Sequence, residues 1–177
     1  MASVWIEQVD RGLIDFIEGI VDIVDLTVRP RQTNEGNSAE FPAVTFFSYD
    51  EKLAEYRQKR FDELGSKNEV EGTAQMLRPL VPYDLFYQVD FWAESQYEIN
   101  EMLRKWEGRV EKHNLLPVLD IDGNSKDIKM ERVDFANADY TKNGEKRFHR
   151  TFTYKIKVEL DERDSYVVPL VTDVDFI

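Results

Sequence analysis

The residues best suited to chemistry are the carboxylates Asp120, Asp122 and Asp127, which alternate with turn-forming residues. Hard cations such as Ca²⁺ prefer clustered oxygen ligands of this kind. A calcium loop needs an acidic or amide residue before its glycine and a bidentate glutamate later. Here Gly123 comes too early and Lys126 adds a positive charge. The pattern therefore favours a solvated hairpin turn over a metal site.

A metal-dependent enzyme is the alternative interpretation of the same carboxylates, with Asp134 added. No lysine or histidine stands at a supporting spacing, and His113 and His149 lie in unrelated contexts. The sequence has no glycine-rich phosphate loop and no nucleophile elbow. It also has no cysteine, which excludes thiolate metal sites and cysteine nucleophiles. We therefore expect no catalytic activity, no cofactor and no metal ion.

Charge and hydropathy limit the partners. The net charge of −12 over 177 residues repels phosphate at long range, so high-affinity nucleic-acid binding is not expected. No apolar run approaches the roughly 20 residues of a membrane helix. The N-terminus lacks the residue order of a signal peptide. We expect one soluble domain over residues 1–177 that does not bind membranes.

One short cluster is basic in this acidic chain, Lys146-Arg147-Phe148-His149-Arg150. It could contact an acidic patch of a partner, or DNA. It could equally guard the edge of a strand against unwanted pairing. The sequence leaves both interpretations open.

The first half of the chain predicts a helix, a short strand and an excursion. Apolar residues recur at three- and four-residue spacing over Ile6–Asp25, which is typical of an amphipathic helix. Arg29-Pro30 and the polar residues after it predict a loop, and Phe41–Phe47 a strand. Asp50–Leu64 has helical propensity with a thin apolar stripe. We interpret residues 50–80 as an excursion between strands.

A strand that leads directly into a helix is the clearest local pattern. Leu85–Ala93 alternates, and aromatic residues on both faces predict that the strand is covered on both sides. Ser95 followed by Glu98 predicts a capping box at the start of the next helix. Phe91 and Trp106 lie on the apolar faces of these elements, so we expect both to be buried.

The second half predicts antiparallel strands over Leu115–Asp120, Asp127–Phe135 and Phe148–Leu160. The apolar parity changes within the second of these, which indicates a bulge. Asn143-Gly144 predicts the turn before the last strand. The fold class is therefore α+β, a mainly antiparallel sheet with two main helices packed on it.

The residues after Tyr166 are too apolar to remain solvated, which makes them candidates for an interface between subunits. The candidate interface residues of the chain are Lys146, Arg147, Phe148, Arg150, Tyr166, Val168, Leu170 and Phe176.

Three segments in this order resemble the tail-terminator proteins of contractile-tailed bacteriophages, also described as tail-completion or sheath-stabilising proteins. They are the N-terminal helix followed by Phe41-Pro42-Ala43-Val44-Thr45-Phe46, the strand–helix unit from Pro82 to Glu111, and the strand opened by Lys146-Arg147. These segments cover about half of the chain, and none is a catalytic signature.

The resemblance implies a structural virion protein, assembled in the host cytoplasm, that forms a hexameric ring. Such a ring caps the tail tube, contacts tube and sheath proteins, and joins the tail to neck or head-completion proteins. DNA would pass through it without specific binding. A neck, head–tail joining or baseplate component is the alternative, and a metal-dependent enzyme is a weaker one.

Overall fold

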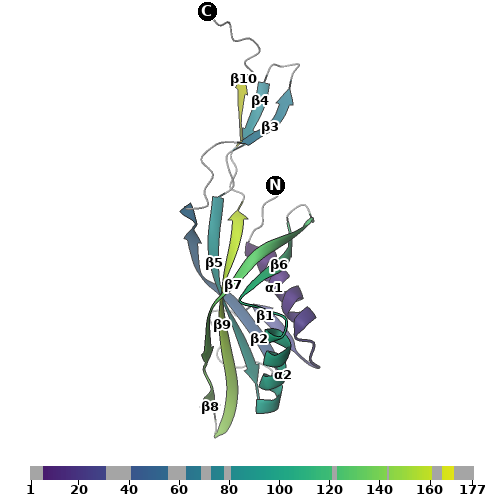
Figure 1. The fold of residues 1–177 in the computed structure, drawn as a ribbon, viewed down its shortest axis with the longest axis vertical. Coiled ribbons are helices and arrows are strands. Elements are labelled where there is room, and N and C mark those ends of the chain that lie inside the picture. The colour runs from purple at the N-terminus through teal and green to yellow at the C-terminus, as the bar shows by residue number, and fades with distance from the viewer. Residues whose placement is uncertain are drawn as a thin grey trace, which may run out of the picture.

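The main body of the chain is a curled sheet with two helices (Figure 1). The computed structural model describes residues 6–30, 41–55, 63–68, 73–77, 81–120, 123–142, 144–160 and 165–169. The helices are α1 (Ile6–Ile20) and α2 (Gln96–Glu107). The strands are β1 (Thr27–Pro30), β2 (Ala43–Leu53), β3 (Glu63–Asn68), β4 (Thr73–Leu77), β5 (Val81–Ala93), β6 (His113–Leu119), β7 (Ser125–Asn137), β8 (Tyr140–Lys142), β9 (Glu145–Leu160) and β10 (Ser165–Pro169).

Strand order in the main sheet is β1-β2-β5-β9-β7-β6, with β8 also paired to β9. β1 pairs with β2 in parallel, and the other pairs in this sheet are antiparallel. The predicted class, α+β with a mainly antiparallel sheet, is therefore confirmed.

A second sheet of three strands, in the order β10-β4-β3, lies beyond one end of the main sheet (Figure 1). It contains part of the predicted excursion. The helix predicted over Asp50–Leu64 is wrong in its described parts: Asp50–Leu53 extends β2, and Glu63 begins β3. Pairing with β5, where Leu53 faces Tyr83, satisfies the backbone of β2 and overrides the local helical propensity.

The N-terminal helix was predicted in the right place but is shorter than expected. α1 buries Val9, Leu13 and Ile17 and ends at Ile20. The chain then turns, with Asp25 in the left-handed region at φ 61°, and enters β1. The predicted loop at Arg29-Pro30 is therefore wrong. β1 has only four residues, too few for strand alternation to be visible in the sequence.

Trp106 of α2 lies at the centre of the core. The capping box is present, because Ser95 accepts a hydrogen bond from the backbone N–H of Glu98 and the Glu98 carboxylate accepts one in return. The Trp106 ring is fully buried against Phe16, Phe91 and Tyr154. Its Nε1 donates to the Tyr154 hydroxyl at 2.8 Å. The predicted burial of Phe91 and Trp106 is confirmed.

The long strands alternate as predicted. The buried side chains of β9 are Phe148, Phe152, Tyr154, Ile156 and Val158, with Arg150 between the first two. The predicted bulge in β7 is confirmed by a shift of register between Arg132 and Asp134. Among the described residues, neither helix has the length and apolar character needed to cross a membrane.

Candidate functional site

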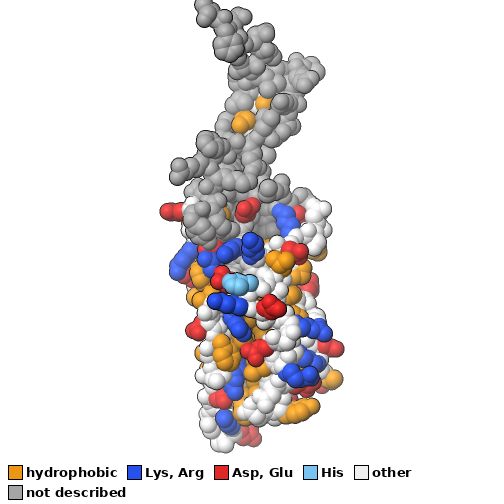
Figure 2. Space-filling view, in the orientation of Figure 1, with side chains coloured by type: hydrophobic (Ala, Val, Ile, Leu, Met, Phe, Trp, Pro, Cys, Tyr) orange, Lys and Arg blue, Asp and Glu red, His pale blue; other side chains and the backbone are white. Residues whose placement is uncertain are grey.

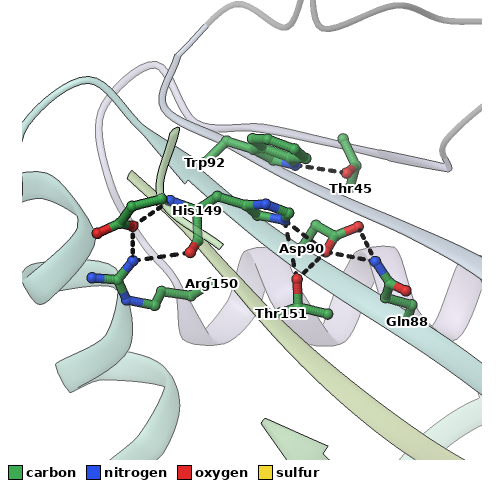
Figure 3. A network of polar contacts seen from close by, with 8 residues as sticks. Thr45, Gln88, Asp90, Trp92, His149, Arg150 and Thr151 are labelled. Atoms are coloured by element: carbon green, nitrogen blue, oxygen red, sulfur yellow. Dashed lines mark hydrogen bonds and ion pairs between the residues drawn. The ribbon is translucent and has the colours of Figure 1, made fainter. Parts of the chain in front are cut away.

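The face of the main sheet that turns away from the apolar core, here called the outer face, carries a buried polar network (Figure 3). Cross-strand pairing places Trp92 opposite His149 and Asp90 opposite Thr151. The Trp92 indole stacks on the His149 imidazole, with ring centroids 3.6 Å apart. Trp92 also donates to Thr45 Oγ1 at 2.9 Å, so the network joins β2, β5 and β9. The expectation that β5 is covered on both faces is confirmed at Asp90 and Trp92.

Asp90 is the centre of this network. Its Oδ1 lies 2.8 Å from His149 Nε2 and accepts the Thr151 hydroxyl at 2.7 Å, and Gln88 Nε2 donates to both carboxylate oxygens. Burial raises the pKa of Asp90, but hydrogen bonds from His149, Thr151 and Gln88 outweigh this effect. The pKa of Asp90 therefore lies below its ordinary value.

The arrangement does not match a nucleophilic triad, although it contains a carboxylate, an imidazole and a hydroxyl. A triad places the acid and the nucleophile on opposite ring nitrogens of the histidine. Here Asp90 and Thr151 both approach His149 Nε2, and the Thr151 hydroxyl already donates to Asp90. This geometry orients the imidazole and ties two strands together, but it does not activate the hydroxyl.

The basic cluster at the start of β9 is engaged within the chain. Arg147 forms ion pairs with Glu94 at 2.5 Å and Glu145 at 2.8 Å, and Arg150 pairs with Asp139. Lys146 lies 3.6 Å from the other oxygen of Asp139 and over the Phe148 ring, which belongs to the core. At Lys146 and Arg147, β9 pairs with β8 on one side, and its pairing with β5 begins only at Phe148. Both interpretations of the basic cluster therefore stay predictions.

The C-terminal candidates fall partly in the second sheet. Tyr166 and Val168 belong to β10 and face Met76 and Ala74 of β4 across an antiparallel pair. Leu170 and Phe176 lie outside the described residues. The interface role of all eight candidate residues stays a prediction.

Asp120, Gly123 and Asn124 lie in the connection between β6 and β7, and Asp127 lies within β7. The Asp120 carboxylate accepts the backbone N–H of Asn124 at 2.9 Å, and Gly123 takes φ 80°. Asp127 and Asp134 are exposed on β7, and Asp122 lies outside the described residues. Within the described parts of the chain, no three histidine, aspartate or glutamate side chains are grouped as metal ligands would be.

The Asp90–His149 contact was missed in the sequence. Strand alternation does place both side chains on the outer face, because each occupies an outward position of its strand. The register between β5 and β9 decides whether they meet, and 59 residues separate them in the chain. No local pattern fixes that register.

Comparisons with known proteins show which solved structure has a similar fold. No protein-family model and no curated protein sequence matches the chain. A solved structure does match: the PVC sheath/tube terminator of an extracellular contractile injection system, in the extended state. The TM-score is 0.60 with 13% sequence identity, and the match covers 100% of this chain and 64% of that protein.

The fold is similar to that of a sheath/tube terminator. The expected resemblance to tail terminators is thus confirmed at the level of the fold. This chain spans about 64% of the length of the matched protein.

Proposed function

We propose that this chain is a structural terminator of a contractile tail or injection particle. In this proposal it forms a hexameric ring that caps the tail tube and joins it to the neck or head. The observation that supports it best is the similarity, over the whole chain, to a protein that terminates both sheath and tube. Tube and sheath proteins are therefore the proposed partners, with neck or head-completion proteins on the opposite side.

The architecture suits such a role. In the proposed subunit both helices pack on one face of the sheet, supported by a single apolar core that contains residues of α1, α2 and the long strands. The other face and the sheet edges are then available for neighbouring subunits. The outer-face network holds three strands together without forming a reaction centre.

The charge of the chain fits a channel that DNA crosses. A ring of subunits that each carry −12 repels phosphate, so DNA would pass without being retained. The predicted contacts of the C-terminal segment, including Tyr166 and Val168, belong to the same proposal. The particle containing this protein would assemble in the host cytoplasm.

The test is the length of tubes and sheaths in producing cells that lack the chain. We expect tubes and sheaths of variable length without it, and a uniform length after complementation. Uniform tubes in its absence would contradict a terminator role. The alternative is a neck, head–tail joining or baseplate component, and the position of the chain in the particle distinguishes it from a terminator. If the alternative is correct, a gold label on this chain would lie away from the tube end.

A further inference from the structure

Three lysines form a row across the outer face of the main sheet. Lys52 of β2 faces Asp84 of β5, Asp84 faces Lys157 of β9, and Lys157 faces Lys129 of β7. The residues Lys52, Lys157 and Lys129 are called the lysine row below. In the space-filling view, lysine and arginine side chains stand among carboxylates and apolar side chains (Figure 2).

Lys52, at one end of the lysine row, forms an ion pair with Asp50 at 2.8 Å, whereas the charge of the other two lysines is only partly neutralised by described residues. Asp84, which lies within the row, is buried and forms an ion pair at 2.7 Å with Lys155, outside the row. Lys157 lies 3.8 Å from Glu131, and Lys129 has no carboxylate within ion-pair distance among the described residues. Like charges directly opposite each other on neighbouring strands destabilise a sheet. The pair Lys129–Lys157 therefore has no stabilising role in the isolated subunit.

A groove of about 440 Å³ lies at the Lys129 end of the row. His113, Leu115, Lys129, Glu131 and Lys157 contribute to its walls. Leu115 is 49% exposed although it is a large apolar side chain on edge strand β6. The groove thus offers an apolar contact next to two ammonium groups, a combination suited to a polypeptide with carboxylates.

Three acidic side chains form a stripe along α1. Glu7, Asp15 and Glu18 are exposed and fall within about 80° of one another around the helix, which turns 100° per residue. Exposed Arg11 lies in the same sector between Glu7 and Asp15, so three carboxylates and one guanidinium leave the stripe with a net negative charge. None of the three forms an ion pair with a described residue. Glu18 lies in the last turn, where the helix dipole disfavours an anion. The basic side chains at this end, Lys105 and Arg109, donate to the backbone carbonyls of Asp22 and Gly19. This charge too has no stabilising role within the subunit.

We propose that the lysine row of one subunit binds the acidic stripe (Glu7, Asp15 and Glu18) of a neighbouring copy. The row spans three strand spacings, roughly 14 Å. The stripe runs from Glu7 to Glu18, eleven steps of helix rise or roughly 16 Å. The two surfaces have opposite net charge and similar length. Because two different surfaces meet, the contact is heterologous, the type that forms a ring when the rotation between subunits closes.

This inference depends on the proposed function, since it names the lateral contact of the proposed ring. Nucleic acid is the less favoured ligand for the row. The row lies among the carboxylates Asp84 and Glu131, and a chain with a net charge of −12 repels a polyanion.

Charge reversal tests the contact, with assembly measured by sedimentation velocity over a range of concentrations. The first variant carries Lys129→Glu and Lys157→Glu, and the second carries Asp15→Lys and Glu18→Lys. We expect each to weaken self-association by roughly 10-fold or more, as close charge pairs do at interfaces. A chain with all four substitutions should recover most of the wild-type affinity, because the opposite charges meet again. Circular dichroism checks that each variant is folded.

The matched control is Arg104→Glu with Lys112→Glu, which changes the net charge by the same amount at exposed positions outside the row. It should leave assembly unchanged.

Two results would show that this contact is wrong while the terminator function stands. In one, the wild-type chain assembles and neither charge reversal weakens its self-association. In the other, the chain with all four substitutions does not recover the wild-type affinity. A lysine-row variant that assembles normally but loses binding to a DNA duplex would instead assign the row to nucleic acid. A monomeric wild-type chain at all concentrations would overturn both proposals.

Discussion

Replacing Trp106 by phenylalanine should destabilise the protein through one buried hydrogen bond as well as through lost packing. The indole is fully buried, and its Nε1 donates to the Tyr154 hydroxyl at 2.8 Å. The smaller ring leaves a space in the core, and the Tyr154 oxygen loses its donor. An unsatisfied buried polar group costs about 1–3 kcal/mol, so with the packing loss we expect about 2–4 kcal/mol in total.

The matching change Tyr154→Phe leaves the indole N–H without its acceptor and should cost about 1–3 kcal/mol. In the double variant neither polar partner remains, so the penalty for an unpaired group disappears. The double variant should be about 1–2 kcal/mol more stable than the sum of the single effects predicts. Urea unfolding followed by circular dichroism measures all four free energies of unfolding.

Tyr87→Phe is the control for this cycle, because it removes another buried hydroxyl that donates to Asp10 and not to Trp106. Its effect should add to that of Trp106→Phe more closely than the effect of Tyr154→Phe does, because the Tyr87 hydroxyl is not the indole's hydrogen-bond partner. If Trp106 and Tyr154 are equally additive, the buried hydrogen bond does not exist as described and the register of α2 against β9 is wrong.

Three further predictions concern the glycines of α1, the outer-face network and the β6–β7 turn. Gly12→Ala should lower the melting temperature at a cost of about 1–3 kcal/mol, because the added Cβ would lie 2.8 Å from Val118 Cγ2. Gly19→Ala should instead raise the melting temperature, because no atom lies within 4 Å of the added Cβ. If Gly19→Ala lowers the melting temperature and Gly12→Ala raises it, α1 is misplaced. Asp90→Asn should cost about 1.5–3 kcal/mol at pH 7. Because the folded pKa of Asp90 is lowered, the stability from its carboxylate is complete above the ordinary value of 3.8 and is lost as the pH falls through the folded pKa. The difference from wild type in urea unfolding should therefore shrink at acid pH, and a constant difference would contradict the network. Asp120→Ala should cost about 1 kcal/mol by removing the acceptor that closes the turn, and calcium should not change the melting temperature of wild type; a calcium shift that this variant abolishes would revive the metal site.

The sequence predicted those structural elements whose defining residues lie close together in the chain. The capping box of α2 needs only Ser95 and Glu98, and the bulge of β7 is visible as a change of apolar parity within that strand. The burial of Phe91 and Trp106 follows from their positions on periodic apolar faces.

Pairings between distant segments could not be predicted. β10 pairs with β4 from about 90 residues earlier, and β1 pairs in parallel with a strand beyond a polar stretch. The Asp50–Leu53 segment has helical propensity, yet pairing with β5 makes it a strand. The outer-face site depends in the same way on the register that brings Asp90 to His149. In each case a tertiary contact decides the structure, and propensity supplies only a weak preference.

The measurement that tests the terminator proposal most directly is the mass of the purified chain in solution, combined with negative-stain images of the same sample. The proposal predicts a species with the mass of six chains and six-fold rings in the class averages. A protein that stays monomeric at high concentration and gives no rings would contradict it.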